Sequence, residues 1–403
     1  MNELHIDKTH WKKTKIGELL YKTEYNDKEH ASERYNRFIK MEHLDAYSLN
    51  IHRWGDSTTE EIPPTFYKVF KQGQILYPTR NPQLKRTALA SFDGICGEKT
   101  LTLSLNEDND GYVPFIAHVF HSSRFIEYAT NARIGSTNPH IRWRDVADYE
   151  FLLPPKAEQK RLAELLWAAD EVVEKEKREM EAIKVFKDRQ MSYLLNGYQH
   201  TQNDGKPDGW ERLTISDLGV VSTSSVDKKQ RPKEKTVSLI NYMDVYTSKT
   251  KKITSDIELM QVTAPDKQIK GNQVNIGDIL FTPSSETKDD IGHSAVVYED
   301  LPNTLYSYHL VRLRFNREID LDFKRYLFNN PSTLAYFTKR AQGITRMTLS
   351  LDDFNETPVL LPPLSEQRQI ALKLSSIDSA IERIEKSIWL SQQIKQELIN
   401  KVF

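Results

Sequence analysis

Two short polar segments hold the side chains best suited to bind a ligand through hydrogen bonds. Arginine and lysine can donate to guanine, asparagine and glutamine can pair with adenine, and aspartate or glutamate can accept from cytosine. The chemistry open to these segments is therefore noncovalent binding through hydrogen bonds, of which recognition of bases is one form, with no bond made or broken. Taken alone, each segment is more often an ordinary variable surface loop. The candidate residues are Arg80, Asn81, Gln83, Lys85 and Arg86 in segment 79–86, and Ser284, Ser285, Thr287 and Lys288 in segment 283–290.

The motifs that would make the chain an enzyme are absent from the sequence. It contains no Gly-x-Gly, no Gly-Lys-Ser/Thr and no Asn/Asp-Pro-Pro-aromatic motif, so methyl transfer and ATP-driven movement cannot originate here. His118 and His121 are three positions apart without a glutamate in metal-binding register, which favours a packed histidine pair over a metal site. Cys96 is the only cysteine, so we expect a small buried hydrophobe. We expect no catalytic residue and no metal or cofactor bound by this chain.

Composition limits the class of protein. The 403 residues suffice for two or three domains, and 56 basic residues nearly balance 57 acidic ones. Apolar stretches fall far short of the ~20 residues that span a bilayer, and the first residues lack the order of a signal peptide. We therefore expect a cytoplasmic protein without a membrane partner.

An internal duplication places the two polar segments in equivalent positions. Segment 152–163 recurs at 360–371, at an offset of 208, and the pairs Phe115/Phe323 and Gly135/Gly343 extend the match upstream. A Gly-x-Ile-Leu run, at 73–76 and at 277–280, precedes each polar segment. The two segments therefore lie on similar scaffolds and differ in almost every side chain.

A heptad pattern follows each Pro-Pro pair and predicts two long helices, at 155–197 and 362–403. The first seam contains Glu176 and Lys187, which either set the register or rotate outward at a stutter; Phe186 and Tyr193 could then take over the apolar face. We expect the first helix to stop at Asn196-Gly197. The apolar seam positions are Leu162, Leu166, Val173, Met180 and Ile183 in the first helix, and Ile370, Leu374, Ile377, Ile381, Ile384, Ile388 and Leu398 in the second.

The segments before the helices predict mixed α+β globules, at 1–154 and 198–361. Short β-prone runs, such as 237–240, 295–298 and 310–315, are interrupted by turn-forming residues. Residues 115–134 and 323–341 each predict one helix with aromatic residues on one face. Residues 198–209 predict a linker.

Taken together, these features resemble one family, the specificity subunits of type I restriction-modification systems. The resemblance covers nearly the whole chain and rests on the Leu-Pro-Pro-x-x-Glu-Gln motifs at 153–159 and 361–367, the helices behind them and the glycine-containing loops. It implies that each globule is a target-recognition domain reading half of a bipartite site in double-stranded DNA. It also implies that the two helices form an antiparallel coiled coil, a spacer on which two copies of a methyltransferase subunit dock.

The resemblance further implies which chemistry the partners supply. Restriction subunits with nuclease and translocase activity would join the complex, and S-adenosylmethionine, ATP and Mg²⁺ would be bound by partner subunits. It also singles out the loops at 135–138 and 343–346 for phosphate or base contacts, through Ser136, Asn138, Thr345 and Arg346.

Two other classes of protein remain open. Neither globule is strongly basic, which departs from the usual charge of a DNA-binding domain and would suit a duplicated coiled-coil adaptor that binds proteins. An enzyme with an unfamiliar active site is the other alternative.

Overall fold

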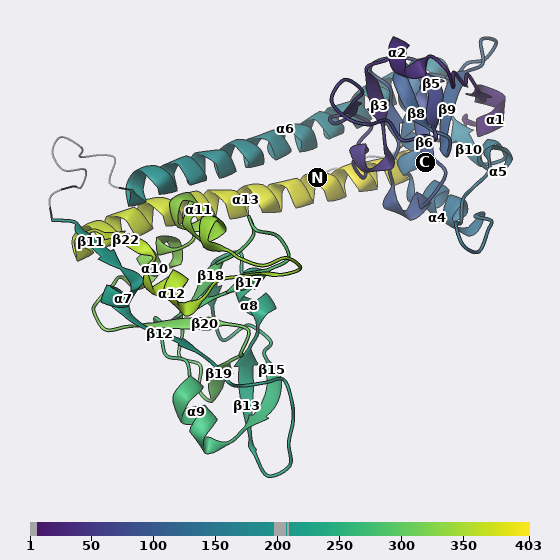
Figure 1. Ribbon diagram of the computed structural model, residues 1–403. Helices are drawn as coiled ribbons and strands as arrows, with labels where there is room; N and C mark the ends of the chain where they lie inside the picture. Colours follow the sequence, from purple (N-terminus) through teal and green to yellow (C-terminus); the bar gives the residue numbers. More distant parts are fainter. Residues whose placement is uncertain (1–5, 197–206, 208) are drawn as a thin grey trace. The chain divides into compact units, whose positions relative to one another are not determined.

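The computed structural model describes residues 6–196, 207 and 209–403 (Figure 1). The chain packs into two compact units, residues 1–178 with 386–403, and residues 179–385. Each unit therefore contains one globule and a part of both long helices. This differs from the expected boundaries, which placed each helix behind its own globule as a separate segment.

The first unit is built on two four-stranded sheets and a two-stranded ribbon. The sheets have the strand orders β2-β9-β6-β7 and β4-β3-β8-β5, and β1 pairs with β10. The strands are β1 (Lys12–Lys15), β2 (Leu20–Thr23), β3 (Arg37–Ile39), β4 (Gly55–Asp56), β5 (Phe66–Phe70), β6 (Ile75–Pro78), β7 (Ala88–Leu89), β8 (Gly94–Gly97), β9 (Thr100–Leu105) and β10 (Glu150–Leu153). The short helices are α1 (Ile16–Leu19), α2 (Ala31–Arg34), η1 (Met41–His43), η2 (Pro82–Leu84), α3 (Val113–Ile116), η3 (Ala117–His121), α4 (Ser123–Asn131) and α5 (Trp143–Ala147).

The second unit repeats this plan with one five-stranded and one three-stranded sheet. Its sheets have the orders β12-β20-β16-β18-β14 and β15-β13-β19, beside the pairs β11-β22 and β17-β21. The strands are β11 (Glu211–Thr214), β12 (Gly219–Thr223), β13 (Lys235–Ile240), β14 (Lys252–Ile253), β15 (Met260–Ala264), β16 (Ile279–Phe281), β17 (Ser284–Ser285), β18 (Ser294–Val297), β19 (Thr304–Tyr306), β20 (Val311–Phe315), β21 (Met347–Thr348) and β22 (Pro358–Leu361). The short helices are α7 (Ile215–Leu218), α8 (Tyr242–Tyr246), α9 (Asp266–Asn272), α10 (Leu321–Leu327), α11 (Pro331–Arg340) and α12 (Leu351–Asn355).

The shared topology confirms the α+β class and agrees with the duplication. The order β2-β9-β6 in the first unit matches β12-β20-β16 in the second, and β3 pairs in parallel with β8 as β13 does with β19. Gly73 and Gly277, which open the repeated Gly-x-Ile-Leu runs, have φ angles of 86° and 85°. Glycine adopts this left-handed conformation without steric cost, so the turn into β6 and β16 uses the same residue in both copies.

Two long helices, α6 (Lys156–Leu195) and α13 (Leu364–Val402), confirm the heptad prediction. Leu162 and Leu166, near the start of α6, share the first core with Ile399, near the end of α13. Leu194, near the end of α6, shares the second core with Leu374, near the start of α13. The helices therefore run antiparallel in each unit. The expected cap residue Gly197, and all of the linker 198–209 except Pro207 and Gly209, lie outside the described residues.

The first seam continues through its polar positions, so of the two alternatives the structure supports polar seam residues over a stutter in which Phe186 and Tyr193 take over. Both aromatic side chains are about half exposed. Glu176 instead forms a hydrogen bond with Ser387 in the first unit, and Lys187 forms a 2.6 Å ion pair with Asp378 in the second. A polar seam position that finds a partner can stay inside, which removes the need for a stutter.

The single helices expected at 115–134 and 323–341 are each divided in two. The first becomes α3 with η3, followed by α4, and the second becomes α10 followed by α11. Ser122 and Asn330, at equivalent positions, end one helix and cap the next by accepting hydrogen bonds from the amides of Phe125 (3.3 Å) and Thr333 (3.0 Å). These residue types compete for backbone groups and so favour helix starts over helix interiors.

The Leu-Pro-Pro-x-x-Glu-Gln motif connects each globule to its long helix. Gln159, completely buried, accepts a bond from the Tyr112 amide (2.8 Å) and donates to the carbonyls of Asp110 (2.9 Å) and Pro154 (2.8 Å). Gln367 repeats this with Asp320 N (2.9 Å) and Pro362 O (2.9 Å).

The glutamate of the motif binds a tryptophan in both units. The indole of Trp11 donates to Glu158 (3.2 Å), and that of Trp210 donates to Glu366 (2.9 Å). In each motif, the glutamine thus binds backbone groups, and the glutamate binds an indole N–H, that would otherwise be buried without partners. Within the part of the chain that is described, no helix is both long and apolar enough to cross a membrane.

Candidate nucleic-acid interface

In the first unit, the two loops singled out from the sequence lie side by side. The amide of Ile141 donates to Thr79 O (3.0 Å), and Arg80 forms an isolated β-bridge with His140. The guanidinium of Arg133 also reaches Gln83 Oε1 at 3.4 Å. Segments 79–86 and 133–140 therefore form one surface at the end of β6.

In the second unit, the equivalent loops meet in the same way. The amide of Leu349 donates to Pro283 O (2.8 Å), and β17 pairs with β21. The guanidinium of Arg346 donates to Ser284 Oγ at 3.1 Å, so a residue of each loop contacts the other. The duplication has preserved this platform of two loops, although the side chains on it differ.

The second loop of each platform is a tight hairpin with an exposed tip. Ile134 and His140 exchange two backbone hydrogen bonds (2.9 and 3.0 Å), as do Gln342 and Thr348 (3.1 and 2.8 Å). Gly343 has a φ of 144°, and a Cβ there would lie 2.0 Å from Arg346 O, so only glycine fits. The tip residues Ser136, Thr137 and Asn138, and their equivalents Ile344, Thr345 and Arg346, are all exposed.

Besides the Arg133–Gln83 and Arg346–Ser284 contacts, three more of the predicted contact residues have partners within the chain. The Lys85 ammonium lies 4.3 Å from the centre of the Tyr47 ring, and Arg86 donates to Met41 O (3.0 Å). Ser285 is only 7% exposed, and its hydroxyl accepts a bond from the Thr287 amide (3.3 Å). These contacts hold the loops in shape, and DNA contact by the three side chains stays a prediction.

The remaining predicted residues fall into two groups by exposure. The exposed ones are Gln83, Ser136, Asn138, Thr287, Lys288, Thr345 and Arg346, and the half-buried ones are Arg80, Asn81 and Ser284. Asn81 and Lys85 flank η2 with φ angles of 53° and 58°, a conformation that orients the η2 turn between them.

Arg80 stands out among the predicted contact residues because one of its buried polar atoms lacks a hydrogen-bond partner in the described part of the chain. Its Nε is buried and has no hydrogen-bond partner among the described residues. It borders a cavity of about 280 Å³ that is also lined by Phe66, Pro78 and Lys99. The pKa of nearby Glu98 is lowered, first by its hydrogen bond to Lys99 and more weakly by the charges of Lys68 and Arg80.

A cluster of cations beside the first platform was missed by sequence reasoning. Lys22, Lys68, Lys99 and Arg142 line a cavity of about 290 Å³ together with Thr79 and His140 of the two loops. Lys68 is 4% exposed, donates to the carbonyls of Glu98 (3.1 Å) and Thr100 (2.9 Å), and has a pKa lowered by burial. These residues come from separate segments, so no spacing pattern in the sequence could have grouped them.

Cations and aromatic residues also gather beside the second platform. Burial, and then the charges of Lys228 and Arg346, lower the pKa of His309. The Tyr308 ring packs against His309 with centroids 3.9 Å apart and is half exposed. The hydroxyl of Tyr242 donates to Ser284 O at 2.9 Å.

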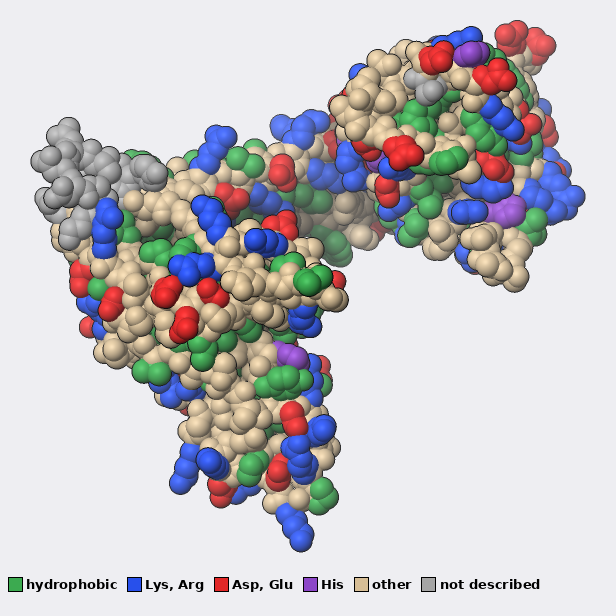
Figure 2. Space-filling model, viewed as in Figure 1, with side chains coloured by type: hydrophobic (Ala, Val, Ile, Leu, Met, Phe, Trp, Pro, Cys, Tyr) green, Lys and Arg blue, Asp and Glu red, His purple; other side chains and the backbone are tan. Residues whose placement is uncertain are grey.

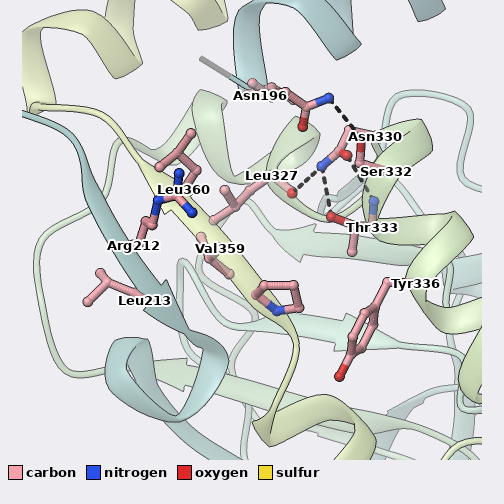
Figure 3. Close-up of a pocket in the computed structure, with 12 residues that line it drawn as sticks. Asn196, Arg212, Leu213, Leu327, Asn330, Ser332, Thr333, Tyr336, Val359 and Leu360 are labelled. Atoms are coloured by element: carbon pink, nitrogen blue, oxygen red, sulfur yellow. Dashed lines mark hydrogen bonds between the residues drawn. The ribbon is translucent and has the colours of Figure 1, made fainter. Parts of the chain in front are cut away.

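A separate pocket of the second unit lies outside this platform. It has a volume of about 330 Å³ and is lined by the end of α6 and by residues of β11, α11 and β22 (Figure 3). Its lining includes no residue of segments 283–290 or 343–348. At the position equivalent to Leu195 of this pocket, the first unit has Phe403, whose larger ring packs 4.9 Å from that of Phe115.

On the face shown in Figure 2, basic and acidic side chains are interspersed over both units. No group of three His, Cys, Asp or Glu side chains able to hold a metal occurs among the described residues. His118 and His121 lie buried in η3, as a packed pair would.

Comparison with known proteins identifies relatives of the chain. Residues 207–396 match the model of the type I restriction modification DNA specificity domain. The chain is 22% identical over 311 residues to the EcoKI specificity subunit of Escherichia coli K12, which covers 74% of this chain and 64% of that protein. It is 21% identical over 373 residues to the MjaIX specificity subunit of Methanocaldococcus jannaschii, which covers 86% and 80%. The chain thus spans under two thirds of the EcoKI subunit, and 58% of the EcoBI subunit.

Solved structures share the fold. A chain from a type I R-M system superposes with a TM-score of 0.64 over 97% of both chains, at 16% identity. The type I restriction-modification S subunit from M. genitalium superposes with a TM-score of 0.51 over 99% of this chain and 98% of that one, at 15% identity.

Proposed function

Since this chain belongs to the family of type I restriction-modification specificity subunits, we propose that it selects the DNA sequence on which such a system acts. The observation that carries the proposal is the repeated platform of two loops. The same backbone arrangement occurs twice, through the amide–carbonyl hydrogen bonds Ile141–Thr79 and Leu349–Pro283. The side chains displayed on the two platforms differ. A similar scaffold with different polar side chains is what reading two different half-sites requires.

The chain acts by binding and positioning, and it carries out no chemistry on the DNA. Methyl transfer from S-adenosylmethionine and ATP-dependent cleavage with Mg²⁺ belong to the methyltransferase and restriction subunits of the complex. Two units on one chain suit two copies of the methyltransferase subunit, one beside each half-site.

The long helices offer a surface on which those subunits can dock. Four exposed apolar residues follow α6 at intervals of seven or fourteen, on a face that the seam does not use. Exposed apolar stripes of this kind mark protein contacts, and heptad spacing suits a further helix. The stripe on α6 is Leu165, Val172, Phe186 and Tyr193, and α13 adds exposed Leu372, Trp389, Leu390 and Ile394.

An exchange of one globule tests the proposed function. Replacing residues 198–361 with the equivalent segment of a relative should change one half of the methylated site and leave the other half intact. Methylome sequencing of cells that carry the complete system measures both halves at once. A change in both halves would contradict two independent readers.

Replacing Phe186 with glutamate tests the docking surface. It should weaken capture of the methyltransferase subunit, whereas Lys184→Glu, an exposed change on the same helix turn, should not. Equal capture of the methyltransferase subunit by both variants would contradict docking at Phe186.

The balanced charge of the globules supports one alternative, a duplicated adaptor that binds proteins. The dependence of binding on salt discriminates between the two, because a DNA-binding protein that neutralises phosphates loses affinity steeply as salt rises. Protein binding with weak salt dependence, and no affinity for DNA, would favour the adaptor.

A further inference from the structure

The tip of the 342–348 hairpin presents an aliphatic side chain entirely to solvent. Ile344 is 99% exposed, the highest value among the exposed large hydrophobic residues of the described chain. The backbone beneath it is held by the two Gln342–Thr348 hydrogen bonds and by the Arg346–Ser284 bond. An isoleucine that packs against nothing adds no stability to the fold, and this one lies on the two-loop platform, where it is free to contact a ligand.

The first unit supplies an internal comparison for this position. Its hairpin, 134–140, has the same two backbone hydrogen bonds. At the offset of 208, Ser136 corresponds to Ile344, Thr137 to Thr345, and Asn138 to Arg346. The middle residue is threonine in both tips, while the flanking residues differ in chemistry.

The shared tip residue suits the phosphates of a DNA ligand, and the two differing tip residues suit its bases. Phosphates are the same at every step of DNA, so a residue common to both hairpins suits a phosphate contact. Bases differ between half-sites, so the two variable positions suit base contacts. An arginine fits guanine, an asparagine fits adenine, and an aliphatic side chain fits the 5-methyl group of thymine.

We propose that Ile344 is a specificity-determining residue that packs against the 5-methyl group of a thymine in the half-site read by the second unit. This inference rests on the proposed DNA-reading function and assigns one base to one residue. Arg346 reads a neighbouring guanine, and Thr345 contacts the phosphate between them. In the first unit, Asn138 reads an adenine, and Ser136 gives no preference for a methyl group.

The test removes the methyl group from the DNA. Once methylome sequencing has given the site, duplexes are made in which each thymine of the second half-site is replaced, one at a time, by deoxyuridine. Binding of the complete complex is measured by fluorescence anisotropy at fixed salt. At one position the substitution should weaken binding about fourfold, the effect of burying one methyl-sized group.

The matching protein variant is Ile344→Ser, which installs the residue of the first hairpin. It should bind the thymine duplex about fourfold more weakly and should not distinguish thymine from deoxyuridine. Because Ile344 is fully exposed, the Ile344→Ser variant should unfold at the same temperature as the wild type. Ser136→Ile is the control, and it should leave the response to deoxyuridine in the second half-site unchanged.

The outcomes separate this inference from the function on which it rests. Specific binding that is indifferent to every deoxyuridine, or an Ile344→Ser variant as sensitive as the wild type, would overturn the role of Ile344 alone. Weaker assembly of the complex by Ile344→Ser, with an unchanged response to deoxyuridine, would also overturn it and place the residue at a protein contact. Loss of all sequence preference by the wild-type complex would instead contradict the proposed function.

Discussion

Lys395 on α13 forms an ion pair with Asp170 on α6, and neither side chain is more than 5% exposed. Asp170 also lies 3.2 Å from Nε2 of His118. Burial would raise the pKa of Asp170, but the hydrogen bond from His118 and the charge of Lys395 outweigh it and hold the pKa below its ordinary value. The carboxylate is therefore charged and paired across the helices.

The second unit contains the same pair with the helices exchanged. Lys187 of α6 pairs with Asp378 of α13 at 2.6 Å, and the Tyr326 hydroxyl donates to Asp378 at 2.6 Å. At the offset of 208, these residues correspond to Lys395, Asp170 and His118. Two equivalent ion pairs thus fix which residues face each other along the antiparallel seam.

Removing one partner of the buried pair should destabilise the first unit strongly. Lys395→Met leaves the buried Asp170 carboxylate with only its contact to His118, which should lower the free energy of unfolding by up to about 3–5 kcal/mol. Lys187→Met should cost less, because Lys187 and Asp378 are 25% and 18% exposed and water can compensate. Urea unfolding followed by tryptophan fluorescence measures both. Recovery of stability in the double variant Asp170→Leu/Lys395→Met would confirm the cause, and an unaffected Lys395→Met protein would contradict it.

The first unit should lose stability as the pH falls below about 6.5. His121 is fully buried and neither ring nitrogen has a partner in the described structure. Burial first, and then the charges of Lys395 and His118, hold its pKa well below the ordinary value. Below about 6.5 the unfolded chain binds a proton that the folded one does not, so stability should fall by up to ~1.4 kcal/mol per pH unit.

Unfolding measured from pH 8 to 5 tests this dependence. His121→Asn, which installs the residue found at the equivalent position 329, should remove that part of the slope. An identical slope in both proteins would assign the dependence to another group.

Replacing the buried glutamine of the Leu-Pro-Pro-x-x-Glu-Gln motif should separate a globule from its helix. Gln159→Leu leaves one amide and two carbonyls without partners, at about 1–3 kcal/mol for each group that stays dry. Hydrogen exchange should rise in the first unit and stay unchanged in the second, and Gln367→Leu should show the reverse. Lys160→Leu, an exposed change beside it, is the control.

Arg80→Ala and Lys288→Ala should each relax one position of one half-site. A side chain that reaches a base edge contributes about 1–3 kcal/mol of discrimination. Lys12→Ala, an exposed change on β1 of the same unit, is the control. Binding measured on a panel of altered sites distinguishes the roles, because uniform weakening at every sequence would make the residue a phosphate contact.

Adding one heptad to both α6 and α13 should lengthen the spacer of the recognised site. Seven residues keep the seam in register and add about 10 Å, or roughly three base pairs. DNA bending absorbs part of this, so the spacer should lengthen by up to about three base pairs. A functional complex with an unchanged spacer would show that the helices recruit partners without measuring DNA.

Elements that follow from a local or repeated pattern could be predicted from the sequence, whereas contacts between segments distant in the chain could not. The duplication, the helices beginning near Lys156 and Leu364 and the apolar seam follow from periodicity, which is a property of the chain itself. The break at Ser122 was missed because a capping serine competes with an aromatic pattern that continues across it. The cations around Lys68 were missed because the sheet brings them together from distant segments.

The two loops of each platform were likewise predicted only in part. Their chemistry and their equivalence were predicted, and the structure shows that the two loops of each unit lie together. That Lys85, Arg86 and Ser285 turn to partners inside the chain could not be predicted, since it depends on Tyr47, Met41 and the path of the loop.

The core of the first globule includes Ile399, Val402 and Phe403, which leave the ribosome only after the whole second globule. At ~5–20 residues per second, the roughly 220 residues that separate Leu166 from Ile388 take about 10–45 s to synthesise. During that time the first globule lacks the helix that covers its core. The nascent chain therefore holds an exposed apolar surface until the last residues of α13 have been made.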